Sequence, residues 1–182
     1  HGTVCSIPER LLREVYGLPF QAAIAEENLR GVMPCYCSIG GEPVSASEHL
    51  LTQILRQEMG FDGVAVADYS AVSNVHHTQK LYETEAEAGL ACLSAGMDVE
   101  LPDTVCFNEE MKAMFAQGKA DMALLDQAVR RVLRAKFRMG LFEHPFALTG
   151  SALSEMVHHP EDELITLQSA LESLVLLKND NH

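Results

Sequence analysis

The segment from Gly60 to Tyr69 constrains the fold of this chain more than any other part. Residues 61–67 form a short, almost uncharged run of β-branched and small side chains, which is typical of a parallel strand covered on both faces. The run ends at Asp68, and the carboxyl ends of parallel strands are where loops converge on one cleft. Asp68 is therefore a candidate catalytic acid. An Asp at this place also suits the N-terminal cap of a following helix, and both interpretations stay open at this level.

Two further apolar runs, at residues 32–36 and 97–102, have a similar strand-like length. Apolar residues at helical spacing fill the intervals between the runs, over residues 48–59 and 83–94. This alternation of strands and helices predicts an α/β fold with a parallel sheet.

Local signals mark where the predicted helices begin and end. Ser6 with Glu9, and Ser45 with Glu48, have the spacing of capping boxes. Gly60 follows the helix expected over residues 48–59, at the position where helices commonly end in glycine. We therefore expect helices to begin near Glu9 and Glu48.

A set of short motifs follows one order along nearly the whole chain. They are Ile7-Pro8-Glu9-Arg10, Glu14-Val15-Tyr16, Pro19-Phe20, Val32 to Tyr36, Gly41-Glu42-Pro43, Leu51 to Arg56, Gly60 to Gly63, Asp68-Tyr69, Ala95 to Pro102, Phe137 to Phe142 and Ala170 to Asn179. Taken together, the motifs resemble glycoside hydrolase family 3, in its β-glucosidase-like branch. The resemblance is collinear, so chance agreement is a poor explanation for it.

The resemblance implies an incomplete fold. Residues 1–141 correspond to the C-terminal part of a (β/α)8 TIM barrel, with about the last three βα units. Residues 142–182 correspond to a linker and the first, truncated segment of a following α/β sandwich domain, in which residues 174–177 would form a strand. A complete barrel has eight strands and typically about 250 residues. We therefore expect a fragment, or a natural half-length product, of a larger enzyme.

The resemblance also assigns roles to individual residues. It implies that Asp68 is the catalytic nucleophile and that Tyr36, Met33 and Tyr69 bind substrate. Packing in the core for Met33, and a place at the barrel rim for Tyr36, are the structural alternatives. A retaining glycosidase needs a second carboxyl group about 5–5.5 Å from the nucleophile. The family likeness places that acid/base residue outside this chain.

Two functions from different classes follow. The first is a fragment of a retaining β-glycosidase that hydrolyses a β-linked glucoside or related oligosaccharide through a covalent glycosyl-Asp intermediate, and that is inactive alone. The second is a non-catalytic half-barrel that serves as a binding or assembly module. Open edges of a parallel sheet seek partners, so a homodimer, or association with missing parts of the enzyme, is an expectation of either function.

Composition excludes other classes. A net charge of −13 argues against nucleic-acid binding, and no apolar run approaches the ~20 residues that span a membrane. The odd number of cysteines predicts free thiols in a reducing compartment, so a cytoplasmic location is favoured over secretion. The five are Cys5, Cys35, Cys37, Cys92 and Cys106.

No metal and no cofactor are expected. His76-His77 and His158-His159 are adjacent pairs, and adjacent residues on a helix do not face each other. Cys35 and Cys37 lack the paired spacing of zinc sites. Asp98 and Glu100 alternate on a predicted strand, and a structural role is favoured for both. The arginines near residues 130–138 indicate a solvated helix end rather than a phosphate site.

Overall fold

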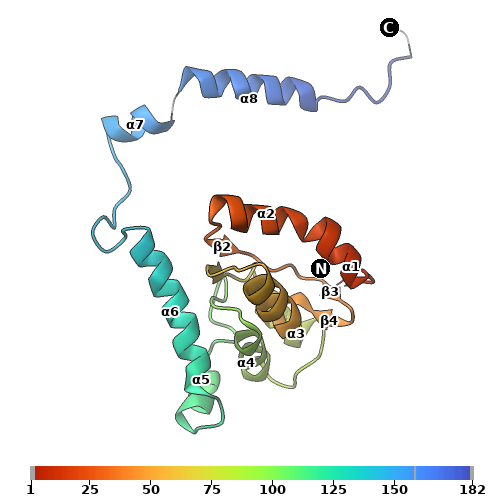
Figure 1. The fold of residues 1–182 in the computed structure, drawn as a ribbon, viewed down its shortest axis with the longest axis vertical. Coiled ribbons are helices and arrows are strands. Elements are labelled where there is room, and N and C mark those ends of the chain that lie inside the picture. The colour runs from red at the N-terminus through yellow and green to blue at the C-terminus, as the bar shows by residue number, and fades with distance from the viewer. Residues whose placement is uncertain (1–2, 158, 181–182) are drawn as a thin grey trace. The chain divides into compact units, whose positions relative to one another are not determined.

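The computed structural model describes residues 3–157 and 159–180 of the chain (Figure 1). The chain divides into two compact units, with the break between Met139 and Gly140. This break lies two residues before the predicted domain boundary. Each unit is described by itself.

Parallel pairing in the first unit confirms the predicted α/β organisation. Strand β2 (Gly31–Val32) pairs in parallel with β5 (Val64–Ala65), with Gly31 opposite Val64. A parallel bridge between Val66 and Val99 adds the segment around residue 99 on the other side of β5. The amide of Val66 donates to the carbonyl of Val32, and that of Ala67 to the carbonyl of Val99, both at 2.9 Å. The segment that ends at Asp68 therefore lies between two parallel neighbours.

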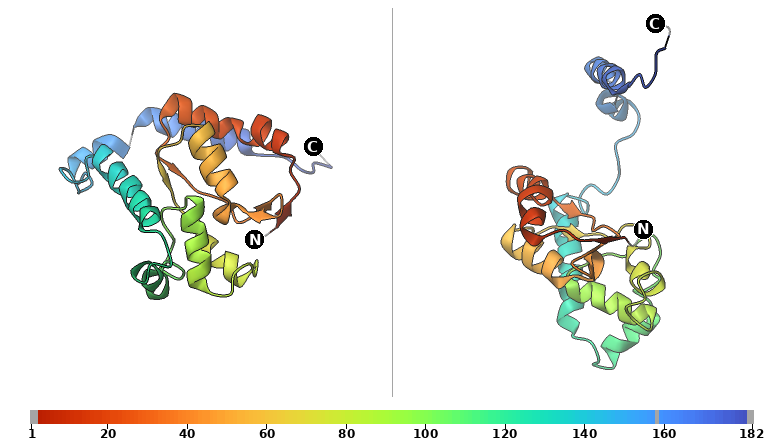
Figure 2. Two further views of the ribbon diagram at one scale, coloured as in Figure 1. Left: turned by 60° about the horizontal axis from the view of Figure 1, so that its bottom comes forward. Right: turned by 90° about the vertical axis from the view of Figure 1, so that its right-hand side faces the viewer.

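A second, small sheet was not predicted. Strand β1 (Val4–Cys5) runs parallel to β3 (Ser38–Ile39), and β3 forms an antiparallel hairpin with β4 (Glu42–Pro43). Gly40 and Gly41 make the turn with φ values of +64° and +89°, a region that residues with a β-carbon seldom occupy. The left view of Figure 2 shows the N-terminal strand beside this hairpin.

Helices surround the strands of the first unit. They are α1 (Glu9–Leu11), the π-helix η1 (Leu12–Tyr16), α2 (Leu18–Glu27), the 3-10 helix η2 (Val44–Ala46), the π-helix η3 (His49–Glu58), α3 (Ala71–His77), α4 (Glu85–Ala95), α5 (Glu109–Ala116) and α6 (Met122–Arg138). The second unit contains α7 (Ser151–Val157) and α8 (Pro160–Ser173).

Both predicted capping boxes are wrong. Helix α1 begins at Glu9 after Pro8, and η3 begins after Glu48, and neither Pro8 nor Glu48 makes a side-chain cap bond. In η3 the Ser47 hydroxyl, rather than Ser45, accepts from the Leu50 amide at 3.2 Å. The structure has its capping box at α4, where the Thr84 hydroxyl accepts from the Glu87 amide at 3.2 Å and the Glu87 carboxylate accepts from the Thr84 amide at 3.1 Å. Gly60, with φ of +75°, does follow the end of η3 as predicted.

The core is built around β5, α3 and α4. Its fully buried side chains are small or medium-sized, and include Ala65, Ala67, Val72, Val75 and Cys92. Small side chains allow the helices to approach the strands closely, and native interiors are packed to crystal-like density. The core therefore fixes the strand that presents Asp68.

The second unit exposes much of its apolar surface. The side chains of residues 174–177 are 75–91% exposed, and residues 174–180 form no strand. The strand expected at residues 174–177 is therefore not seen. No helix within residues 3–157 or 159–180 is both long and apolar enough to cross a membrane.

Candidate active site

Asp68 lies at the carboxyl end of the β5 strand segment and is half-buried. The backbone on both sides of it is hydrogen-bonded to the neighbouring parallel segment. The Ala67 amide donates to the Val99 carbonyl, and the Ser70 amide to the Leu101 carbonyl, both at 2.9 Å. A backbone held at two points aims the carboxylate more rigidly than a free loop.

The alternative that Asp68 caps the following helix is wrong. The N-cap of α3 is Ser70, in the left-handed region with φ of +63°, and no side chain caps this helix. The Asp68 carboxylate instead accepts a 2.7 Å hydrogen bond from the amide of Tyr69. The carboxylate therefore binds the backbone just after the strand and not the first turn of the helix.

Tyr36 reaches the same place from the loop after β2. Its hydroxyl donates a 2.6 Å hydrogen bond to the carbonyl of Tyr69. Burial and a hydrogen bond with the Asp68 carboxylate raise the pKa of Tyr36 above its ordinary value. The amide of the Gln79 side chain holds the Tyr36 carbonyl at 3.2 Å. The fold thus brings Asp68, Tyr36 and the backbone of Tyr69 together.

The other two residues predicted to bind substrate are exposed. The Tyr69 side chain is 64% exposed and that of Met33 is 62% exposed. Met33 also lines an open apolar groove of about 370 Å³, between η1, α2, η3 and β2. Neither side chain packs in the core, so the structural alternative for Met33 is wrong.

Asp98 has the structural role that was favoured for it. Its side chain is fully buried. One carboxylate oxygen accepts from Arg56 at 2.7 Å and from the Ala65 amide at 2.9 Å, and the other accepts from Arg131 at 2.9 Å. Burial lowers the pKa of Arg56, and the Asp98 charge opposes that shift. The three charged groups join η3, α6 and β5.

Glu100 is also structural. It is buried, and its carboxylate accepts from the amides of Cys106, at 2.9 Å, and of Phe107, at 2.7 Å. These bonds close the loop between the last parallel segment and α5. Glu100 is therefore fully engaged with backbone amides.

The arginines of α6 divide between two partners. Arg138 pairs with Asp62 at 2.8 Å, which lowers the pKa of Asp62, and Arg134 lies 3.7 Å from the same carboxylate. Arg131 belongs to the buried Asp98 network. The predicted solvated helix end therefore describes Arg134 and Arg138, but not Arg131.

Histidines and cysteines form no metal site in the part of the chain that the structure describes. His76 bonds to the carbonyl of Tyr82 and His77 to the carboxylate of Glu85, both at 2.9 Å. His158 lies outside the described residues. All five cysteines are free thiols.

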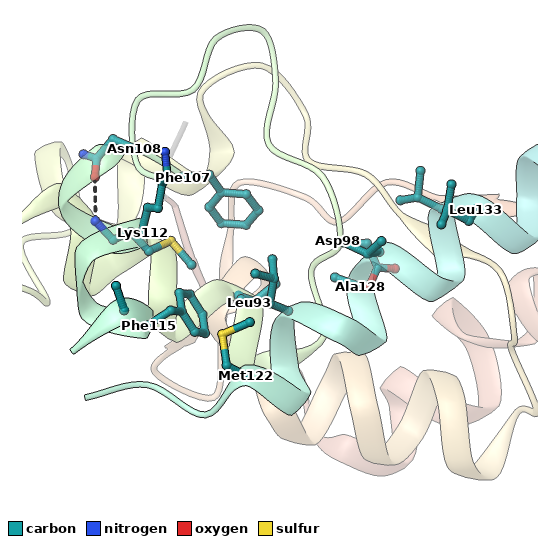
Figure 3. Close-up of a pocket in the computed structure, with 14 residues that line it drawn as sticks. Leu93, Asp98, Phe107, Asn108, Lys112, Phe115, Met122, Ala128 and Leu133 are labelled. Carbon is teal, nitrogen blue, oxygen red and sulfur yellow. Dashed lines mark hydrogen bonds between the residues drawn. The ribbon is translucent and has the colours of Figure 1, made fainter. Parts of the chain in front are cut away.

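A second apolar groove, of about 640 Å³, lies between α4, α5 and α6 (Figure 3). Its walls are mostly hydrocarbon, among them Leu93, Phe115 and Leu133. Asp68, Tyr36 and Tyr69 are not among its lining residues. A hydroxyl-rich sugar needs convergent polar groups, so this groove does not suit one.

Comparison with known proteins finds relatives of this chain. The family model described as "Glycosyl hydrolase family 3 N terminal domain" matches residues 1–135. A β-xylosidase of Formosa agariphila is 35% identical over all of this chain and 26% of its own length. A lysosomal β-glucosidase of Dictyostelium discoideum is 33% identical over 99% of this chain and 22% of its own.

Solved structures lead to the same family. A β-glucosidase from Erythrobacter marinus matches with a TM-score of 0.85 and 34% identity, over 98% of this chain and 23% of its own. A β-glucosidase from Listeria innocua in complex with glucose matches with a TM-score of 0.84 and 31% identity, over 98% and 24%. The chain thus spans about a quarter of the length of these relatives. On this evidence the chain belongs to glycosyl hydrolase family 3.

Proposed function

We propose that this chain is the C-terminal part of the catalytic (β/α)8 barrel of a retaining β-glycosidase, with Asp68 as its nucleophile. The Asp68 carboxylate attacks the anomeric carbon of a β-linked sugar, and the aglycone leaves with a proton from a second carboxyl group. Water then hydrolyses the glycosyl-Asp intermediate. The second carboxyl group lies in a part of the protein beyond this chain.

The position of Asp68 carries the proposal. It follows a buried strand between two parallel neighbours, at the end where α/β enzymes gather catalytic groups, and it caps no helix. The Tyr36 hydroxyl approaches the carboxylate and donates to the adjacent carbonyl. A neutral phenol beside a carboxylate leaves the charge of the carboxylate in place.

The substrate class comes from the relatives. Their names include both β-glucosidase and β-xylosidase, and solved relatives hold glucose or laminaribiose. We propose a β-linked glucoside or xyloside as the substrate. The choice between them depends on the group that the enzyme accepts at the sugar's C5 position.

The decisive experiment uses the full protein that contains this chain. Asp68→Asn should reduce kcat for an aryl β-glucoside or β-xyloside by at least 10³-fold, as expected when a residue essential to a catalytic unit is removed. A 2-deoxy-2-fluoro glycoside should label the wild-type protein on the peptide that contains Asp68, and should leave Asp68→Asn unlabelled.

Asp103→Asn is the matched control, because Asp103 is exposed and follows the neighbouring parallel segment. It should keep the wild-type rate and labelling. A normal rate in Asp68→Asn, or a label on another carboxylate, would overturn the assignment of the nucleophile.

The 182-residue chain alone should turn over little or no aryl β-glycoside, because the proposed acid/base residue is elsewhere. Brisk hydrolysis by this chain would show that both carboxyl groups lie within it. Light scattering on the same sample would test self-association, which the open sheet edges favour.

A further inference from the structure

Two cysteines lie side by side at the edge of the small sheet. Cys5 in β1 is paired in register with Ile39 of β3. Cys37 precedes β3, and its carbonyl accepts from the Val44 amide at 3.0 Å, which extends the hairpin by one pair. Residues two apart in an extended strand point to the same face. Cys5 and Cys37 are therefore diagonal neighbours on one face.

The Cys5 thiol interacts with Cys37. A hydrogen bond with the Cys37 side chain, followed by burial, raises the pKa of Cys5. Both side chains are half-buried and line the open groove of about 370 Å³. A small oxidant can therefore reach them, whereas Cys92 and Cys106 are completely buried.

We propose that Cys5 and Cys37 form an oxidation site that hydrogen peroxide converts to an intramolecular disulfide. The Cys37 sulfur attacks one peroxide oxygen, the O–O bond breaks, and a Cys37 sulfenic acid and one water form. The Cys5 sulfur then attacks the sulfenic sulfur, and a second water leaves. Overall, two thiols lose two electrons and two protons, and one peroxide is reduced to two waters.

The disulfide would restrain the loop that carries Tyr36, so the oxidation state of the protein would affect this loop. Cys37 is the next residue after Tyr36, whose hydroxyl bonds to the backbone beside Asp68. A Cys5–Cys37 bond closes the loop that contains α1, η1, α2 and β2, so it restricts the unfolded chain. The oxidised form should therefore be more stable, with β1 held firmly against β3.

Cys35 is the competing thiol, because it is exposed and only two residues from Cys37. Burial and interaction with Cys37 raise the pKa of Cys35 as well. Cys35 lines the same groove as Cys5 and Cys37, so it tests whether Cys37 pairs selectively with Cys5. Cys5 is the preferred partner, because the Ser38 amide, next to Cys37, donates to the Thr3 carbonyl at 3.0 Å and so holds the β1 segment beside Cys37.

The test is peptide mapping of the full protein that contains this chain. The reduced protein is treated with one equivalent of hydrogen peroxide, remaining thiols are alkylated, and the protein is digested with chymotrypsin. Cleavage after Tyr36 separates Cys35 from Cys37. The expected product is a Cys5 peptide disulfide-linked to a Cys37 peptide, with Cys35 alkylated. Dithiothreitol should release the two peptides.

Three variants complete the experiment. Cys35→Ser should keep both the linked peptide and a rise in melting temperature on oxidation. Cys5→Ser and Cys37→Ser should lose both, and circular dichroism checks that they fold. A Cys35–Cys37 or Cys5–Cys35 bond, disulfide-linked dimers, or unlinked sulfinic acids would each overturn the proposal. These readouts are independent of hydrolase activity, so they stand apart from the test of Asp68.

Discussion

The Arg56 guanidinium donates a 2.7 Å hydrogen bond to the carboxylate of Asp98, and both side chains are buried. The same carboxylate accepts from Arg131 and from the backbone of β5 at Ala65, three residues before Asp68. Helices η3 and α6 are thereby tied to the strand that presents the candidate nucleophile. The position of Asp68 depends on this network as well as on the backbone ladder.

Asp98→Ala should lower the free energy of unfolding by about 3–5 kcal/mol, because removal of one partner leaves buried charges uncompensated. Here two guanidinium groups would lose their shared anion. Urea denaturation measures the change. Asp103→Ala, at an exposed position nearby, should change stability by less than about 0.5 kcal/mol. Equal effects of the two substitutions would contradict a network role for Asp98.

Tyr36→Phe should cost about 0.5–1.5 kcal/mol of stability, since it removes the donor to the Tyr69 carbonyl. In the full protein it should also lower kcat/KM, because the Asp68 carboxylate loses its phenolic neighbour. Denaturation and steady-state kinetics give the two values. Tyr16→Phe, whose ring is 53% exposed, serves as the control and should leave both unchanged. An unaltered kcat/KM in Tyr36→Phe would show that the Tyr36 hydroxyl has no role in the active site.

Gly89→Ala should destabilise the protein by about 1–3 kcal/mol, although alanine favours a helix over glycine. A β-carbon at this position in α4 would lie 2.6 Å from the Cys106 carbonyl oxygen. This oxygen belongs to the backbone, so it cannot move aside as easily as a flexible side chain. Gly31→Ala is the comparison, because its nearest neighbour would be at an ordinary 3.8 Å. If Gly89→Ala proved as stable as wild type, the close contact between Gly89 of α4 and the Cys106 backbone would be disproved.

The free energy of unfolding should fall as the pH rises above about 9. Burial raises the pKa of Cys92 to about 12 from an ordinary value of 9.0, and burial also raises that of Cys106. Above pH 9 the unfolded chain therefore releases protons that the folded chain keeps. The contribution is complete below the unfolded pKa, and it is lost as the pH rises toward the folded pKa. The slope is at most about 1.4 kcal/mol per pH unit for each thiol.

Urea midpoints measured between pH 8 and 11 test this prediction. Lysines and tyrosines titrate in the same range, so the informative quantity is the difference between wild type and Cys92→Ala. The variant starts less stable, because it leaves a small cavity, but its stability should decline less steeply with pH. Parallel curves would show that Cys92 ionises as easily in the folded state as in the unfolded state.

Local sequence patterns predicted the elements with strong signals. The uncharged run before Asp68 and the spacing of residues 48–59 identified a buried strand and a helix, and Gly60 marked the helix end. The sheet of β1, β3 and β4 was missed because its two-residue strands lie outside any long apolar run, whereas β5 lies within the uncharged run before Asp68. The capping box of Thr84 and Glu87 was missed and one of Ser45 and Glu48 was predicted, since a hydroxyl residue stands three residues before a Glu in both places.

By itself, the amino-acid sequence indicated the family, through motifs spread along the chain, and through that family the candidate nucleophile. It also indicated the alternation of strands and helices around Asp68, because those elements show in residues close together in the chain. Only the tertiary structure decided which groups surround them. It placed the Tyr36 hydroxyl beside Asp68, gave Asp98 two arginine partners, and set Cys5 against Cys37. Such contacts join distant segments, and they depend on strand register and helix packing, which no local pattern encodes.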